Sequence, residues 1–278
     1  MACTIQEKLA DGSSHNGAVA SKPIQYMETV EAYNKWAKVY DTDGSFLQAL
    51  DTIEMRHLLP LFLQLLTRVS GSDTTKLIDL GCGTGRNTLL LAEVAAPEMK
   101  IIGLDASPGM LDVAREAIHR AALNSNESLT DRVSLGIFDL LHRPLEVPAN
   151  SLGAAGVIST LVLEHIPLQQ FFESATMLLR PGGYLLVTNM HSDMGAISQA
   201  GFVDTVTGTK IRPTSFSHTL KDVVAAADQA GFQMEKLGGQ SAWERTVDET
   251  LAGLLGQRAK KWTGVTVWFG ICFKKRFE

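Results

Sequence analysis

The sequence predicts an α/β fold in which helices cover both faces of an open, mostly parallel sheet. From residue 75 to residue 190, short apolar runs alternate with segments of helical periodicity, which is typical of parallel strands joined by helices. The predicted strands are residues 76–80, 100–104, 133–138, 154–159 and 184–189. Two further strand-like runs, residues 232–239 and 265–274, lack a strong crossover helix between them. We therefore expect the last strand to be antiparallel and to lie at an edge of the sheet.

The segment before the sheet predicts helices. Residues 1–24 are rich in Gly, Ser, Ala and Asn without periodicity and are predicted to form a mobile N-terminal tail. Apolar residues recur every three or four positions from Glu28, which indicates a short helix, and again in a longer helix that Pro60 is expected to kink or split. Residues 25–278 are interpreted as a single domain, in which residues 25–72 form a helical lid.

Three later helices carry clear terminal signals. Ser107 followed by Pro108 predicts a helix start, a helix over residues 168–180 ends at a Pro-Gly-Gly turn, and Thr219 with Asp222 resembles a capping box. Residues 191–217 lie between the fifth strand and the Thr219 helix and are long for a structureless loop. We expect this insertion to form a small subdomain or lid.

Composition excludes several classes of function. The net charge of -5 argues against a nucleic-acid surface, and no apolar run approaches the ~20 residues that span a bilayer. The N-terminal segment lacks the apolar centre of a signal peptide, and Cys3, Cys82 and Cys272 form no CxxC pair. We expect a soluble, cytoplasmic protein with no membrane or nucleic-acid partner; the sequence leaves its oligomeric state open.

Three alternating glycines mark the end of the first strand. Gly81, Gly83 and Gly85 lie in "LIDLGCGTGRNT", where that strand meets the first helix of the sheet. Residues without Cβ allow positive φ and close approach of a ligand, and the helix N-terminus offers free N–H groups. A dinucleotide fingerprint would need glycine at Arg86, which disfavours NAD, and Asp79 suits a ligand with a cationic group.

Acidic residues end the next two strands. Asp105 follows Gly85 by 20 residues, the place where a carboxylate accepts hydrogen bonds from the ribose hydroxyls of an adenosine. Asp139 ends the third strand and is expected to face the adenine amino group, with Met110 and Leu140 against the ring. Together these residues predict an adenosine-containing ligand at the carboxyl edge of the sheet.

These motifs resemble those of class I S-adenosylmethionine-dependent methyltransferases, of the group similar to menaquinone and ubiquinone biosynthesis methyltransferases. The resemblance is carried by "LIDLGCGTGRNT", "IIGLDASPGML", "IFDLL", "ISTLVLEHIP", "LLRPGGYLLVTNM" and "TVWFGICFK". The stretches "AYNKWAKVYDTDG" and "LVLEHIP" are further similar to fungal natural-product methyltransferases, including gliotoxin-cluster N-methyltransferases. The resemblance implies a Rossmann-like, seven-stranded sheet with a reversed last strand, and S-adenosylmethionine as the cofactor.

The resemblance also implies the cofactor site. Thr160 would help hold the amino-acid end of the cofactor, and Tyr33 and Tyr40 would close over its sulfonium, unless the two tyrosines only pack in the core. The full set of expected cofactor-binding residues is Tyr33, Tyr40, Asp79, Gly81, Gly83, Gly85, Asp105, Ala106, Met110, Asp139, Leu140 and Thr160.

Methyl transfer from a sulfonium needs mainly alignment of the acceptor and exclusion of water, because orientation alone supplies effective molarities on the order of 10^5 to 10^8 M. Where the acceptor carries a proton, His165 and His191 are the predicted general bases and His218 is a further candidate, each with a structural role as the alternative. No metal site is predicted, because Glu164 and the His191–Asp193 pair offer too few converging carboxylates.

The predicted acceptor is a small molecule, of the secondary-metabolite type, methylated on nitrogen, oxygen or carbon. Residues 28–51 and 191–217 are expected to wall its pocket. Two alternatives stay open at this point. One is a cofactor-binding enzyme that catalyses a different reaction, such as a cyclisation, and the other is a nicotinamide-dependent oxidoreductase.

Overall fold

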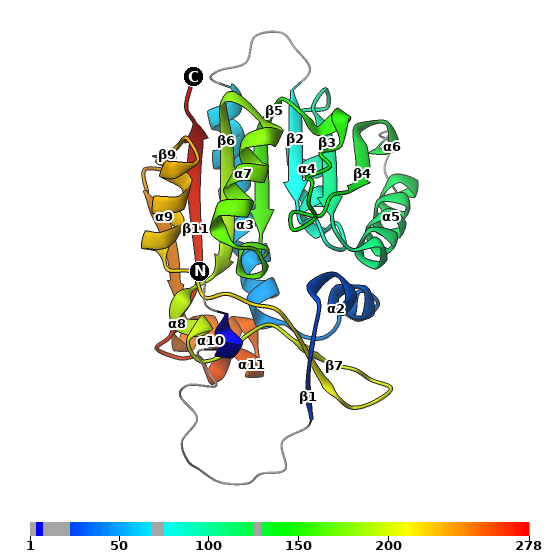
Figure 1. Ribbon diagram of the computed structural model, residues 1–278, viewed down its shortest axis with the longest axis vertical. Coiled ribbons are helices and arrows are strands. Elements are labelled where there is room, and N and C mark those ends of the chain that lie inside the picture. Colours follow the sequence, from blue (N-terminus) through cyan, green and yellow to red (C-terminus); the bar gives the residue numbers. More distant parts are fainter. Residues whose placement is uncertain (1–3, 8–22, 68–74, 125–128, 278) are drawn as a thin grey trace.

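The computed structural model describes residues 4–7, 23–67, 75–124 and 129–277, and its centre is a mixed sheet (Figure 1). The strands of this sheet follow the order β10-β11-β6-β5-β2-β3-β4, with β9 also paired to β11. Their bounds are β2 (Lys76–Leu80), β3 (Lys100–Asp105), β4 (Val133–Ile137), β5 (Ala154–Thr160), β6 (Leu179–Met190), β9 (Phe232–Glu235), β10 (Ala242–Thr246) and β11 (Thr266–Lys275). The five strands from β2 to β6 are mutually parallel, as the alternating pattern predicts.

The last strand is reversed, as predicted, but the expectation that it lies at an edge is wrong. β11 pairs antiparallel with β6 on one side and with β9 and β10 on the other, so the outermost of seven positions is shared by two short strands. The physical reason lies in burial: β11 is buried continuously from Val267 to Phe273, which suits an interior strand, whereas β9 exposes Gln233 and Met234.

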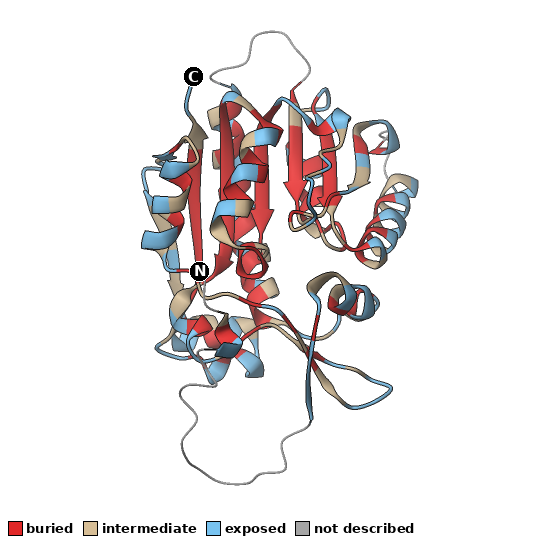
Figure 2. Ribbon diagram, in the orientation of Figure 1, coloured by how far each residue is buried: buried red, intermediate tan, exposed pale blue. Residues whose placement is uncertain are grey.

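Helices cover both faces of the sheet and produce two cores. Neighbouring residues of one strand belong to different cores, as Leu77 and Ile78 do, because successive side chains point to opposite faces. The interior strands β2, β3, β5, β6 and β11 are accordingly mostly buried, whereas the helices expose their outer sides (Figure 2). The covering helices are α3 (Phe46–Thr67), α4 (Arg86–Val94), α5 (Pro108–Leu123), α6 (Leu129–Arg132), α7 (Leu168–Leu178) and α9 (Leu220–Gln229). The short helices α10 (Glu249–Leu255) and α11 (Gln257–Lys260) lie beyond the carboxyl edge of the sheet (Figure 1).

Helix α3 is not split at Pro60. It is one continuous helix through the proline, and its buried residues belong to the first core. Leu58, Leu59 and Phe62 are fully buried around the proline, so packing against the sheet compensates for the hydrogen bond that proline cannot donate. The predicted starts of α5 and α9 are confirmed, since the side chains of Ser107 and Thr219 cap them.

We call the second, smaller sheet the lid, after its expected role. It joins β1 (Ile24–Met27), near the start of the domain, to β8 (Lys210–Pro213) and β7 (Phe202–Val203) of the insertion, whose first turn is α8 (Ser192–Gly195). With α2 (Thr29–Trp36) these strands lie beyond the carboxyl ends of the parallel strands (Figure 1).

Part of the predicted mobile tail has a defined place. The Ile5 backbone N–H donates to the carbonyl of Ser215, and the Ile5 side chain is buried. Of that segment, residues 4–7, 23 and 24 are described, and the others lie outside the described ranges. Within those ranges, no helix combines the length and the apolar character needed to cross a bilayer.

Candidate active site

Each of the three glycines in the first turn is needed for a different structural reason. All have positive φ, which favours glycine, and a Cβ on Gly81 would overlap with the side chain of Val162. A Cβ on Gly85 would lie 3.1 Å from the Cβ of Ala114, so this glycine lets α4 approach α5. A Cβ on Gly83 would meet nothing within 4 Å, so Gly83 borders open space.

The open space beside Gly83 is a narrow cavity at the carboxyl edge of the sheet, which we call the inner cavity. The structure brings ten of the twelve predicted cofactor-binding residues to its wall: Tyr33, Tyr40, Gly81, Gly83, Asp105, Ala106, Met110, Asp139, Leu140 and Thr160. They come from the glycine turn, from three strand ends and from the lid, so local motifs far apart in the sequence converge on one site.

Asp105 organises the turn that it faces. One of its carboxylate oxygens accepts the Gly83 N–H at 2.8 Å and the other accepts the Ser107 N–H at 2.8 Å. Burial raises the pKa of this carboxyl, while the backbone hydrogen bonds oppose the shift. Asp139 accepts the Leu141 N–H at 2.8 Å with one oxygen.

Asp79 and Gly85 are the two predicted cofactor residues that do not line the inner cavity. Asp79 is buried beneath the glycine turn, where its Oδ2 accepts from the Thr88 hydroxyl at 2.7 Å and its Oδ1 has no hydrogen-bond partner. Burial raises the pKa of Asp79 to about 7. In this geometry Asp79 supports the turn rather than reaching the cavity.

A second, larger cavity of about 660 Å³ adjoins the first, and we call it the outer cavity. Tyr33, Tyr40 and Leu161 line both cavities and form the junction between them. Leu161 is the non-glycine residue with positive φ (57°) among the described residues, and its N–H donates to Thr188 at 2.9 Å. Backbone strain of this kind persists where the surrounding structure holds it and is common at functional sites.

His165 and Tyr33 form a buried pair at the junction. The Nδ1 of His165 lies 2.8 Å from the Thr214 carbonyl and must donate to it, so in the neutral ring Nε2 accepts the Tyr33 hydroxyl, also at 2.8 Å. Burial lowers the pKa of His165 to about 4 and raises that of Tyr33. Both ring nitrogens of His165 are therefore engaged, and its basicity is reduced.

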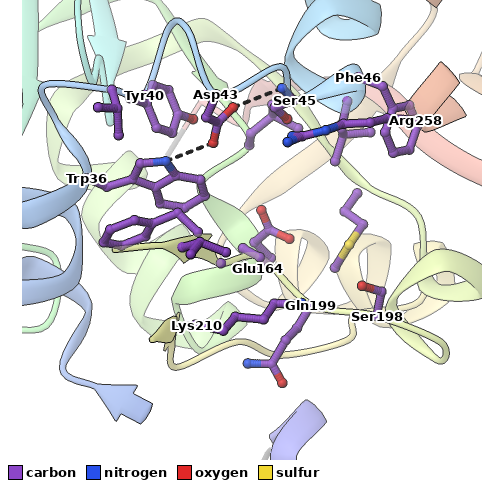
Figure 3. Close-up of a pocket in the computed structure, with 18 of the residues that line it drawn as sticks. Trp36, Tyr40, Asp43, Ser45, Phe46, Glu164, Ser198, Gln199, Lys210 and Arg258 are labelled. Carbon is purple, nitrogen blue, oxygen red and sulfur yellow. Dashed lines mark hydrogen bonds between the residues drawn. The ribbon is translucent and has the colours of Figure 1, made fainter. Parts of the chain in front are cut away.

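Glu164, next to that histidine, faces the outer cavity, although the sequence did not single it out as a candidate base. Its carboxylate projects into the cavity in Figure 3. Oε2 has no hydrogen-bond partner, and Oε1 lies 3.7 Å from the Nε2 of His165. The side chain is 5% exposed, and burial raises the pKa of Glu164 to about 8.

The other histidines named from the sequence lie outside both cavities. His191 caps α8 by accepting the Asp193 N–H at its Nδ1, and its Nε2 lies 3.1 Å from Glu244. His218 is buried, contacts the Ile166 carbonyl through Nε2 and stacks on Phe216. In this arrangement both rings have structural partners.

A buried ion pair holds the helices against the sheet beside the site, and the sequence analysis did not foresee it. Arg86 donates to Asp51 at 2.7 Å and to the Thr52 hydroxyl at 2.9 Å. Asp51 also accepts the indole N–H of Trp268 at 2.9 Å and the hydroxyl of Thr188. One carboxylate thus links α3, α4, β6 and β11.

Within the described ranges, no group of three His, Cys, Asp or Glu residues is arranged to hold a metal ion.

Comparison with known proteins decides the family. The family described as "Methyltransferase domain" matches residues 72–238, and that of protein-L-isoaspartate(D-aspartate) O-methyltransferases matches residues 6–137. An uncharacterized methyltransferase of Emericella nidulans is 55% identical over 96% of this chain and 98% of its own length. The chain is a class I S-adenosylmethionine-dependent methyltransferase. This methyltransferase therefore uses S-adenosylmethionine as its cofactor, and the nicotinamide alternative is not supported.

Solved structures share the methyltransferase fold at low sequence identity. An S-adenosylmethionine-dependent methyltransferase from Mesorhizobium loti is 18% identical, with a TM-score of 0.52 over 76% of this chain and 96% of that one. The cyclase SpnF is 16% identical, with a TM-score of 0.55 over 93% of this chain and 100% of that one. At such identities the likeness concerns the fold alone.

Proposed function

We propose that this enzyme transfers the methyl group of S-adenosylmethionine to a nitrogen, oxygen or carbon atom of a small secondary metabolite bound in the outer cavity. The observation that carries the proposal is the pair of adjoining cavities whose junction consists of Tyr33, Tyr40 and Leu161. One compartment suits the cofactor, the other suits an acceptor, and both open on the same few side chains.

The inner cavity has the features that an adenosyl cofactor needs. Gly83 leaves the space that a Cβ would fill, and Asp105 and Asp139 present carboxylates at successive strand ends. Met110 and Leu140 supply apolar surface for the adenine ring, and Thr160 would hold the amino-acid end. When bound there, the cofactor supplies an electrophilic methyl group on a cationic sulfur.

The residues of the junction would then position the acceptor and exclude water. The buried hydroxyls of Tyr33 and Tyr40 remain neutral because burial raises the pKa of both. A neutral, packed junction excludes bulk water, and holding two reactants in fixed orientation supplies much of the rate of such a transfer.

Glu164 is better suited than His165 to accept a proton from the acceptor. Glu164 lines the outer cavity and its buried Oε2 has no hydrogen-bond partner, whereas both nitrogens of His165 are engaged. A carboxylate with a pKa of about 8 is a stronger base than an ordinary glutamate, and a cationic cofactor nearby would favour its ionised form. His165 then has the role of orienting the hydroxyl of Tyr33.

Cyclisation is the alternative reaction, because the cyclase SpnF has the same fold. The relative from Emericella nidulans, which matches nearly the whole chain, is described as a methyltransferase, and this favours methyl transfer.

Calorimetry tests cofactor use directly. S-adenosylmethionine and S-adenosylhomocysteine should bind with one site per chain, and NAD should show no comparable affinity. Tight binding of NAD alone would contradict the proposal.

The transfer itself is tested by incubating the enzyme and an isotopically labelled methyl donor with small-molecule extracts, followed by mass spectrometry. A compound that gains the labelled methyl group only with active enzyme identifies the acceptor. If rearranged products form without any gain of label, the cyclisation alternative is correct.

A further inference from the structure

Three cations line the exposed side of the outer cavity without a counter-charge. Lys210, Arg258 and Lys261 belong to the lid strand β8, to α11 and to the residue after α11. Within the described part of the chain, none of the three has a carboxylate within ion-pair distance or a side-chain hydrogen bond; Lys261 only stacks on the ring of Trp262. Arg258 extends across the cavity in Figure 3.

The positive charge at this rim is unbalanced. Burial, together with repulsion from Arg212 and Lys261, lowers the pKa of Lys210, as expected where cations gather without anions. Asp43 also lines this cavity and carries a negative charge, but among the described residues it forms no ion pair with the three cations; its two oxygens accept the Trp36 indole N–H and the Ser45 N–H. An anionic group placed at the rim would gain several charge-assisted contacts.

The walls between this rim and the buried floor are aromatic. The rings of Trp36 and Phe202 stack with centroids 5.0 Å apart, and those of Phe46 and Trp262 stack at 5.9 Å. Such surfaces fit a flat or bulky apolar body, and the volume of about 660 Å³ admits a molecule of metabolite size.

At the floor, Glu164 presents an unpaired carboxylate oxygen beside the junction with the inner cavity. Its 5% exposure contrasts with the exposed Arg258 and Lys261 at the rim. Arg258 and Lys261 therefore lie nearer the solvent than the buried carboxylate of Glu164.

We propose that the methyl acceptor is an amphipathic organic anion whose acidic group binds at Lys210, Arg258 and Lys261 while its proton-bearing nucleophilic atom faces Glu164. The apolar body of the acceptor lies between the stacked rings. This inference rests on the proposed function of the outer cavity as the acceptor site, and it names the class of acceptor that the site selects.

Two fluorescent probes of nearly equal apolar shape test the charge selection. 8-Anilinonaphthalene-1-sulfonate carries an acidic group, and N-phenyl-1-naphthylamine lacks it. Each is titrated into the full-length protein with saturating S-adenosylhomocysteine, so that the inner cavity is filled. The wild-type protein should bind the sulfonate at least tenfold more tightly than the neutral probe, and added salt should reduce this preference.

The double variant Lys210→Ala/Arg258→Ala should lose at least tenfold in affinity for the sulfonate and leave the neutral probe unchanged. Phe202→Ala should weaken both probes, which would locate them in the outer cavity. Lys236→Ala, an exposed lysine outside the cavity, is the matched charge control and should change neither. Circular dichroism establishes that each variant is folded.

The acceptor class is overturned if the wild-type protein binds both probes equally, or if Lys210→Ala/Arg258→Ala keeps the preference for the sulfonate. In that case binding of S-adenosylmethionine and transfer of labelled methyl would still support the proposed function. Failure to bind S-adenosylmethionine would instead remove the proposed function whatever the probes show.

Discussion

Replacing Glu164 by glutamine should stabilise the protein in a strongly pH-dependent way. The carboxyl has an ordinary pKa of 4.5 and a pKa of about 8 in the folded chain, where burial disfavours its charge. Since the folded-state pKa is raised, the neutral carboxyl is fully compatible with the fold below pH 4.5. Its contribution is lost as the pH rises toward 8, because ionisation is easier in the unfolded chain.

The magnitude follows from these two values. Relative to Glu164→Gln, the wild-type chain should be less stable by about 1 kcal/mol at pH 5 and by about 4 kcal/mol at pH 8, an average slope of about 1 kcal/mol per pH unit. Above pH 8 the difference should level off, because the carboxyl is then ionised in both states.

Urea unfolding followed by circular dichroism, at pH values from 5 to 9 and without cofactor, measures this difference. Glu146→Gln, at a glutamate whose side chain is 82% exposed, controls for the loss of one surface charge. A stability difference between wild type and Glu164→Gln that does not vary with pH would refute the reasoning. It would mean that Glu164 is solvated or paired in solution.

Three further outcomes are expected. Gly83→Ala should stay folded and lose at least tenfold in calorimetric affinity for S-adenosylmethionine, because its Cβ enters the open space of the inner cavity. Gly81→Ala should instead unfold at a lower urea concentration, because its Cβ overlaps with the side chain of Val162. Equal effects of the two substitutions would contradict this distinction. Asp51→Ala should lower the free energy of unfolding by about 3–5 kcal/mol, since it leaves the guanidinium of a buried ion pair without its partner; a loss under 1 kcal/mol would argue against the pair. The pKa of His165 is lowered to about 4, so the wild-type chain should lose about 2 kcal/mol of its free energy of unfolding between pH 7 and pH 5. His165→Gln should remove this loss. An unchanged pH dependence in urea unfolding would show that the ring is not held neutral.

The strand ends and the glycine turn could be predicted because their signals are local. A parallel strand, a bend without Cβ and a helix start lie within a dozen residues in "LIDLGCGTGRNT", and parallel strands bring their carboxyl ends to one edge of the sheet. Gly83, Asp105 and Asp139 therefore meet at one cavity without any knowledge of tertiary contacts.

The remaining features depend on contacts between distant segments. Whether Glu164 or His165 faces the outer cavity is decided by the short 3-10 turn Leu163–His165 and by the Thr214 carbonyl of the insertion, which holds the histidine ring. His191 caps a helix of only four residues, which is too short to be predicted from hydrophobic periodicity. The pairing of Asp51 with Arg86 joins two helices whose relative placement only the packed sheet defines.

The two cavities are lined by different parts of the fold, and this affects how the acceptor specificity of such an enzyme can change. The large sheet carries the strand ends that line the inner cavity, whereas much of the wall of the outer cavity comes from α2, the small sheet and α11. Substitutions in these peripheral pieces can alter the guest while leaving the scaffold undisturbed. A library confined to positions such as Phe202, Lys210 and Arg258 is therefore the economical route to new alkylation specificities on this backbone.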